Sequence, residues 1–171
     1  MPPVTDAITL ILAVFATATA VYWGFVLGRL IRLSRHTPLL ANGLDLPAVE
    51  ELVSVIVPAH DEARVIERMV ASMRAQRDAR IEVLVVLDRC TDDTLARLEA
   101  AAEDDPRIRP IVNETCPDEW AGKCHAASVG AAAAKGDWLL FTDADVRFDV
   151  DVIRAAVAIA PSEAIDLLSA Y

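Results

Sequence analysis

Four short apolar runs, separated by segments with helical periodicity, constrain the fold of this 171-residue chain more than any other feature. The first run, residues 52–57, is rich in β-branched residues and stops at Pro58, which indicates a buried strand. Residues 81–87, 108–112 and 138–142 have the same character. Because strands that alternate with helices favour an α/β fold, we expect a mostly parallel sheet flanked by helices.

The segments between the runs carry apolar residues at helical spacing. Val65, Met69 and Met73 recur at i, i+4 and i+8, which predicts an amphipathic helix over residues 62–76. The other expected helices begin after Thr91 as an N-cap, span residues 122–135 with Gly136 as the C-cap, and span residues 151–160.

An uncharged stretch of 22 residues, 7–28, precedes this alternation. As a helix it is roughly 33 Å long, enough to cross a bilayer core. Arg29, Arg32 and Arg35 follow it, whereas the leader carries only Asp6. A secretory signal peptide has the opposite charge order, so the positive-inside rule predicts a single-pass helix in the plasma (inner) membrane with the rest of the chain cytoplasmic. Residues 29–51, with two prolines and a glycine, are expected to form a juxtamembrane linker.

The segment beyond the basic residues is strongly acidic. The whole chain has a net charge of −10, and beyond Arg35 only 13 Lys and Arg residues face 25 Asp and Glu residues. Such a segment repels nucleic acid, which proteins bind largely through cationic contacts to phosphate. A phosphorylated ligand would therefore need a metal ion to supply neutralising charge.

Three of the expected strands end in carboxylates. They are Asp61-Glu62 after the first strand, Asp88 after the second, and Asp143-Ala144-Asp145 after the fourth. Parallel sheets bind ligands outside the carboxyl ends of their strands, where these groups would meet. Paired Asp143 and Asp145 suit Mg²⁺ or Mn²⁺, although aspartates at strand ends also form solvated turns and helix caps.

Other motifs are missing from the sequence. It contains neither a G-x-G-x-x-G pattern after the first strand nor a P-loop, which argues against a glycine-bound dinucleotide and a P-loop nucleotidase. Cys90, Cys116 and Cys124 form no C-x-x-C pair, and a zinc site that adds His125 lacks the local spacing of zinc motifs.

The motifs VSVIVPAHDE, VLVVLDRCTDDT and WAGKCHAASVGAAAAKGDWLLFTDADV, in this order and spacing, resemble the family 2 inverting glycosyltransferases with the GT-A fold. The resemblance runs from about residue 52 to residue 148. The segment 116–123 is most similar to membrane-associated members that glycosylate hopanoid- and carotenoid-type lipids. By this resemblance, residues 52–171 are the nucleotide-sugar-binding part of a glycosyltransferase domain.

The resemblance implies transfer of a sugar from a nucleotide-sugar, expected to be a UDP-sugar, to a lipid or polysaccharide acceptor with inversion. The metal, Mg²⁺ or Mn²⁺, would assist departure of the diphosphate. The implied nucleotide-sugar-binding residues are Pro58, Asp61, Glu62, Asp88 (uracil-type base), Lys123 (diphosphate) and Asp143, and the implied metal ligands are Asp145 and Asp143.

Two motifs depart from the family pattern. His60-Asp61 stands where an aromatic-Asn pair is usual, and residues 88–91 replace Asp-Asp-Gly-Ser, so base specificity stays open. In the family, the catalytic base lies in a segment that follows the region of resemblance, so we assign no base. The resemblance therefore predicts that this chain is a fragment, a truncated product or half of a split enzyme, and that it has poor activity alone. A nucleotidyltransferase, which usually has a glycine-rich loop after its first strand, and a non-catalytic membrane-tethered nucleotide-binding module are the alternatives.

Overall fold

The computed structural model describes residues 3–36, 39–162 and 166–168. The chain divides into two compact units, residues 1–39 and residues 40–171. The first unit contains one helix, and the second contains the sheet that the sequence predicts.

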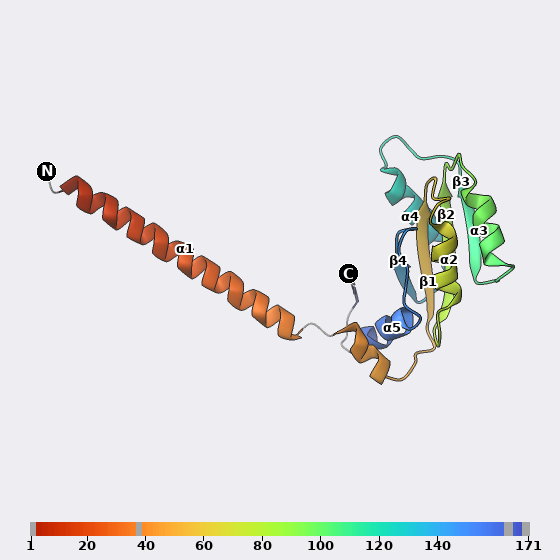
Figure 1. Cartoon of the computed structure of the whole chain (residues 1–171), viewed down its shortest axis with the longest axis horizontal. Coiled ribbons are helices and arrows are strands. Elements are labelled where there is room, and N and C mark those ends of the chain that lie inside the picture. The colour runs from red at the N-terminus through yellow and green to blue at the C-terminus, as the bar shows by residue number, and fades with distance from the viewer. Residues whose placement is uncertain (1–2, 37–38, 163–165, 169–171) are drawn as a thin grey trace. The chain divides into compact units, whose positions relative to one another are not determined.

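Helix α1 spans Pro3–His36 (Figure 1). Its segment Asp6–Arg32 has a mean hydropathy of 2.1 and is long and apolar enough to cross a membrane. The hydroxyls of Thr17 and Thr19 donate to carbonyl oxygens four residues earlier, which satisfies both polar groups within the helix. The helix continues past residue 28 into the expected linker, because strong helix formers such as Leu30 and Arg32 follow.

The second unit is built on a four-stranded parallel sheet (Figure 1). Its strands are β1 Leu52–Ala59, β2 Arg80–Asp88, β3 Ile108–Asn113 and β4 Trp138–Phe141. The spatial order is β3-β2-β1-β4, so the direction of strand addition reverses between β1 and β4. The predicted α/β fold is confirmed.

Strand β1 continues through Pro58, where the sequence predicted its end. The carbonyl of Ile56 accepts from Thr142 N (3.1 Å), so Ile56 presents its polar backbone atoms toward β4. The polar backbone groups of a strand point to alternate sides from one residue to the next, so the nitrogen of Pro58, two residues after Ile56, also points toward β4. Because β4 ends at Phe141, the missing N–H of Pro58 costs the ladder no hydrogen bond.

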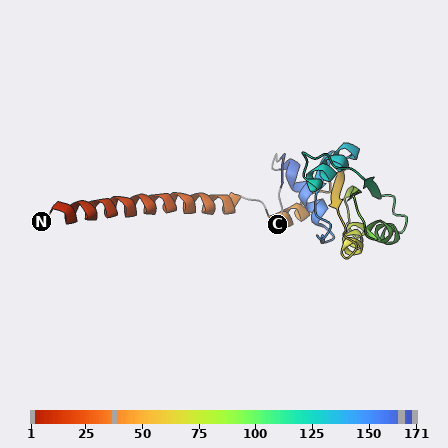
Figure 2. The same ribbon diagram turned by 90° about the horizontal axis from the view of Figure 1, so that it is seen from above.

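The helices pack on both faces of the sheet, as Figures 1 and 2 show. They are α2 Ile66–Arg74, α3 Thr94–Ala102, α4 Gly122–Ala133 and α5 Val152–Ser162, with a short 3₁₀ helix, η1 Leu40–Asp45, before the first strand. Three predicted helix boundaries are wrong. Residues 62–65 form a turn before α2, α3 has Asp93 rather than Thr91 at its N-cap position, and α4 ends before Gly136.

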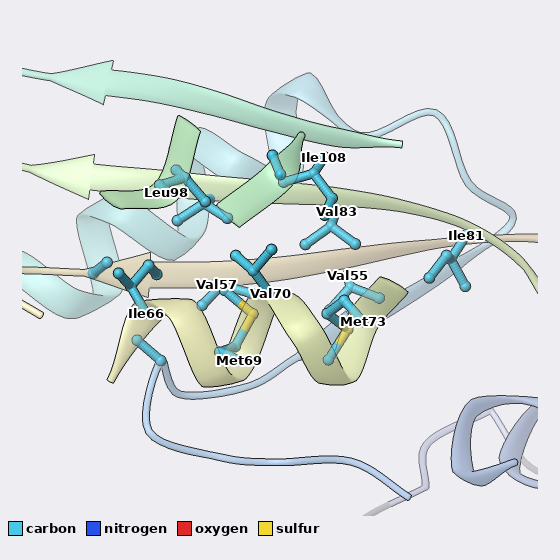
Figure 3. Packing of buried hydrophobic residues seen from close by; sticks show 14 of the residues in the cluster. Val55, Val57, Ile66, Met69, Val70, Met73, Ile81, Val83, Leu98 and Ile108 are labelled. Atoms are coloured by element: carbon cyan, nitrogen blue, oxygen red, sulfur yellow. The ribbon is translucent and has the colours of Figure 1, made fainter. Parts of the chain in front are cut away.

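The main core lies on one face of the sheet, where α2 and α3 pack against the strands (Figure 3). The predicted stripe of α2, with Met69 and Met73 fully buried, packs against alternating valines of the strands. Leu98 of α3 and Ile153 of α5 belong to the same cluster. The apolar residues that alternate along the strands and those that recur at helical spacing in α2 therefore pack together in one apolar layer.

Helix α4 covers the opposite face. It approaches the sheet closely at Gly130, because a Cβ added there would lie 2.5 Å from Cγ2 of Ile56 and 3.1 Å from Cγ2 of Val86. A position without a side chain thus sets the distance between α4 and the two central strands.

A buried polar cluster lies at the amino ends of the strands. The carboxylate of Glu82 accepts from the Ser54 hydroxyl (2.6 Å), the Lys135 backbone N–H (2.6 Å) and Arg109 Nη1 (3.1 Å). The N–H of Gly136 also donates to the Ser54 hydroxyl, and a Cβ at Gly136 would strike the backbone of β1. Gly136 thus provides close approach to β1, which explains why its predicted role as a helix cap is wrong.

The 3₁₀ helix η1 belongs to the sheet-containing unit, although the sequence placed it in a linker. Gly43 is buried so close to α5 that a Cβ would overlap the carbonyl of Ala155. The guanidinium of Arg154 donates to the carbonyls of Leu44 and Leu46. These contacts involve backbone atoms, which is why apolar periodicity did not reveal them.

The close approach at Gly130 predicts that Gly130→Leu destabilises the sheet-containing unit by about 1–3 kcal/mol, because α4 must move away from β1 and β2. The matched control is Ala132→Leu, on an exposed position of the same helix, and we expect it to change stability by less than about 0.5 kcal/mol. Urea unfolding of the full chain in detergent measures both. Equal effects of the two substitutions would contradict the assignment.

The Glu82 cluster predicts a pH-dependent contribution to stability. Burial raises the pKa of Glu82, but the hydrogen bonds from Ser54 and Lys135 and the charge of Arg109 outweigh it and lower the pKa from its ordinary 4.5. The contribution is therefore complete above the unfolded pKa and is lost as the pH falls through the folded one. Glu82→Gln should cost about 1–3 kcal/mol at pH 7, with a smaller cost at pH 3–4. A pH-independent difference between wild type and variant in urea unfolding would refute this.

Candidate functional site

A cavity of about 200 Å³ opens at the carboxyl ends of β1, β2 and β4, beside the first turns of α4. It lies at the reversal of strand order, where parallel sheets bind ligands. Six residues that the sequence singled out line it: Pro58, Glu62, Asp88, Lys123, Asp143 and Asp145. Ala59, His60, Ala126 and Ala144 complete the lining.

Asp88 is the most buried carboxylate of the cavity, with 4% of the residue exposed. Its Oδ1 accepts from Arg89 Nε (3.0 Å) and Asn113 Nδ2 (2.9 Å), and its Oδ2 accepts from Arg89 Nη2 (2.7 Å). The Arg89 hydrogen bonds lower the pKa of Asp88 against the opposing effect of burial, and Asn113 adds to the lowering. Asp88 is thus held ionised in a fixed orientation.

Arg89 adopts the left-handed backbone conformation, with φ = 51°. Residues other than glycine, asparagine and aspartate adopt it infrequently. Its own N–H donates to the Asn113 carbonyl (2.8 Å), so both backbone and side chain are fixed. Gly122 makes room for the pair, because a Cβ there would lie 2.6 Å from Arg89 Nη2 and 2.9 Å from Asp88 Oδ2.

Asp61 connects the loops that follow β1 and β2. Its Oδ1 accepts from the backbone N–H groups of Thr91 (2.6 Å) and Asp92 (3.2 Å), and its Oδ2 from the Thr91 hydroxyl (3.1 Å). The Thr91 backbone hydrogen bond is the main reason why the pKa of Asp61 is lowered. Among the described residues that line the cavity, this loop contributes His60 and Glu62 rather than Asp61.

His60 bridges the same two strand ends. Its Nδ1 lies 2.6 Å from the Asp88 carbonyl oxygen, which accepts, so Nδ1 carries a proton. Its Nε2 lies 4.0 Å from Asp61 Oδ2. The imidazole therefore forms part of the cavity wall, between the carboxyl ends of β1 and β2.

Asp143 and Asp145 follow β4 on the opposite side of the cavity. Lys123 Nζ lies 2.6 Å from Asp143 Oδ1. The hydrogen bond with Asp143 raises the pKa of Lys123 above its ordinary value, and the charge of Asp145 adds to the effect. Both partners of this ion pair are more than half exposed (66% and 52%), so a ligand can reach them.

The donor set fits a divalent metal that the substrate helps to bind. Within residues 3–36, 39–162 and 166–168, no three His, Cys, Asp or Glu side chains are grouped so that they hold a metal by themselves. Asp143 and Asp145 supply hard oxygen ligands on the cavity wall, and Mg²⁺ or Mn²⁺ commonly completes its shell with water and phosphate oxygens. The zinc alternative is not favoured, because its cysteines and histidine do not form such a group within the described residues.

Sequence reasoning did not assign His60, which lines the cavity, nor Arg89, Asn113 and Gly122, which surround Asp88. Asn113 ends β3 at the same edge as the acidic ends of β1, β2 and β4, and this polar terminus was a detectable signal. The pairing of Arg89 with its neighbour Asp88 depends on the positive φ of Arg89, which no local pattern indicates. The role of Gly122 appears only where α4 meets the loop after β2.

The arrangement resembles known proteins. The 4,4'-diaponeurosporenoate glycosyltransferase of Staphylococcus haemolyticus is 31% identical over 97 residues, which cover 57% of this chain and 25% of that protein. The mannosyltransferase PcManGT of Pyrobaculum calidifontis, in complex with GDP-Man and Mn²⁺, is 28% identical with a TM-score of 0.65 and matches 86% of this chain and 43% of that one. TarS 1-349 of S. aureus, in complex with UDP, is 26% identical with a TM-score of 0.54, over 64% of this chain and 32% of the TarS 1-349 chain.

These matches confirm the predicted GT-A fold of the sheet-containing unit. The chain spans about a quarter of the length of the S. haemolyticus protein and less than half of the two structural neighbours' chains. The model of the family described as glycosyl transferase family 2 matches residues 54–167, which include most of β1, all of β2, β3 and β4, and every described residue that lines the cavity. The chain therefore belongs to glycosyl transferase family 2.

Proposed function

We propose that the cavity binds a nucleotide-sugar, and that the chain is the donor-binding part of an inverting, metal-assisted glycosyltransferase. The observation that carries this proposal is the distribution of charge along the cavity. A fixed carboxylate, Asp88, lies at one side, a cation, Lys123, lies beside a helix N-terminus, and the Asp143/Asp145 pair lies at the other side. A nucleoside diphosphate needs the same order of groups for its base, its phosphates and its metal.

The diphosphate would lie against the start of α4. The N-cap position, Ala121, has no polar side chain, so the first N–H groups of α4 depend on solvent or a ligand for hydrogen bonds. Helix N-termini bind phosphate through such N–H groups and the helix dipole. Lys123, in the first turn, adds a full positive charge at the same place.

The metal would be held by Asp145 and Asp143, with phosphate oxygens and water completing its shell. When bound, it would neutralise charge that develops on the departing diphosphate. Pro58 and Glu62 line the side of β1 and would contact the nucleoside. Asp61 would act on the nucleoside through the position of the loop at residues 91–92, to which its carboxylate is bonded.

The acceptor is proposed to be a lipid or a polysaccharide. Helix α1 has the length and apolar composition of a membrane span, which would hold the cavity near lipid acceptors. The basic residues after the apolar segment support a cytoplasmic position for the sheet-containing unit at the plasma membrane. The name of the S. haemolyticus relative, a diaponeurosporenoate glycosyltransferase, supports a lipid acceptor.

The proposed metal site predicts that UDP binds to the full chain in detergent with Mn²⁺, and that Asp145→Asn weakens this binding at least about tenfold. The loss follows because one of the two carboxylate ligands becomes neutral. Isothermal titration calorimetry with and without Mn²⁺ measures the effect. The control is Asp118→Asn, an equal change of charge on an exposed residue before α4. UDP binding that does not depend on Mn²⁺ or on Asp145 would refute the proposal.

The Lys123–Asp143 ion pair predicts that replacing Lys123 changes the affinities for Mn²⁺ and for UDP in opposite directions. Lys123→Met should raise Mn²⁺ affinity without nucleotide by about two- to fivefold, because Asp143 loses a competing cation. The same substitution should lower UDP affinity about tenfold, because a charged contact to phosphate is lost. Electron paramagnetic resonance of free Mn²⁺ and calorimetry with UDP measure the two effects. Lys135→Met, at the opposite end of the sheet, is the control, and a fall of both affinities would contradict the assignment.

A further inference from the structure

Gln76 is a buried polar residue just after the end of α2, with 7% of the residue exposed. Its side-chain Nε2 donates to the carbonyl of Ser72 in α2 (3.2 Å) and to the carbonyl of Asp149 (2.8 Å). Its Oε1 accepts from the backbone N–H of Ile153 (3.4 Å). The oxygen and the nitrogen of one amide are thus both bonded to a segment 73 to 77 residues away in the sequence.

That segment is the end of the connection between β4 and α5, residues 142–151. At its start, the Thr142 N–H donates to the Ile56 carbonyl of β1 (3.1 Å). At its end, the backbone N–H of Arg77 donates to the Val150 carbonyl (3.0 Å), beside the bonds of Gln76. The connection is therefore held by β1 at one end and by the residues after α2 at the other.

Asp143 and Asp145 lie between these two attachments, and both line the cavity. Ala144, between them, is buried in the apolar core. The Val146 N–H donates to the Asp143 carbonyl (3.3 Å), which closes a turn around the pair. The direction of the two carboxylates therefore depends on the conformation of the connection as a whole.

The attachments of the connection differ in how precisely they fix its backbone. Ala144 and Phe148 pack against the core, and such apolar contacts are non-directional. Hydrogen bonds weaken steeply when donor and acceptor lose their alignment, so the bonds of Gln76 fix the orientation of the peptide groups that they reach. A buried amide is also costly to leave unpaired, which opposes movement of Asp149 and Ile153 away from Gln76.

We propose that Gln76 is a positioning residue for the metal pair, an inference that rests on the proposed function for the role of the two aspartates. By holding the backbone at Asp149 and Ile153, Gln76 fixes the connection that presents Asp143 and Asp145. Groups behind metal ligands tune metal affinity because they set the orientation of the ligands. A Gln76 with a merely structural role would change stability but neither the folded conformation of the connection nor its affinity for a metal.

The first measurement is hydrogen exchange of the metal-free full chain in detergent, read by mass spectrometry over residues 142–151. Gln76→Met has a side chain of similar length without an amide. We expect it to speed the exchange of the Val146 N–H and its neighbours about three- to tenfold, the factor that corresponds to one lost hydrogen bond. Wild-type exchange rates across the connection in the folded variant would overturn the inference.

The second measurement is Mn²⁺ affinity in the presence of UDP, by electron paramagnetic resonance of free Mn²⁺. Gln76→Met should lower this affinity at least about threefold, since changes behind a metal ligand commonly weaken metal binding by tenfold or more. The control is Leu98→Ala, which creates a cavity in the core below α3 and lowers stability without removing a bond of the connection. It should retain the wild-type Mn²⁺ affinity, and an equal fall in both variants would show that Gln76 acts through stability alone.

A third variant keeps the test decisive if Gln76→Met does not fold, which circular dichroism and urea unfolding report. Gln76→Asn retains the amide but is one methylene shorter, so it loses part of the hydrogen bonding. Its exchange rates and its Mn²⁺ affinity should lie between those of wild type and Gln76→Met. Wild-type values of both in Gln76→Asn would then count against the positioning role.

The outcomes separate the role of Gln76 from the proposed function. If the wild-type chain binds no Mn²⁺ with UDP, the proposed metal site fails, and hydrogen exchange still decides whether Gln76 fixes the connection. If the wild-type chain binds Mn²⁺ and the folded Gln76 variants bind it equally well, the positioning role is overturned while the metal site stands.

Discussion

The parallel pairing of β1 with both β2 and β4 is the constraint on which the rest of the structure depends. Because all the strands run in one direction, their carboxyl ends meet at one edge. The reversal of strand order beside β1 opens that edge between the loops that follow β1 and β4. Because α4 packs closely against Ile56, the N-terminus of α4, with Gly122 and Lys123, lies at the same opening.

The repulsion among the carboxylates at this edge is offset by neighbouring hydrogen-bond donors and cations, not by the net charge of the chain, which is negative. Hydrogen bonds from Arg89 and Asn113 hold Asp88 ionised, and backbone N–H groups do the same for Asp61. Asp143 is paired with Lys123 in an exposed position. The more buried groups are thus fixed by donors within the fold, whereas the exposed Lys123–Asp143 pair is accessible to ligands.

Much of the fold was predictable because burial imposes a simple period on each element. The β-branched runs identified all four strands, and the spacing of Val65, Met69 and Met73 identified α2. Helix ends were less predictable, since they depend on single hydrogen bonds, such as that from Ile66 N to the Glu62 carbonyl. Gly136 looked like a helix cap from its position, but the backbone of β1 determines its role.

The sequence alone determined the four strands, the membrane-length apolar segment and six of the residues that line the cavity, because burial periods, acidic groups at strand ends and the motif order are all local patterns. Only the tertiary structure decided how these groups are used. It turned Asp61 toward the loop at residues 91–92, joined Arg89 and Asn113 to Asp88, and placed Lys123 on Asp143. The physical reason is that backbone dihedral angles and contacts between distant segments determine which donors reach each carboxylate. Neither the dihedral angles nor these contacts leave a periodic pattern in the sequence.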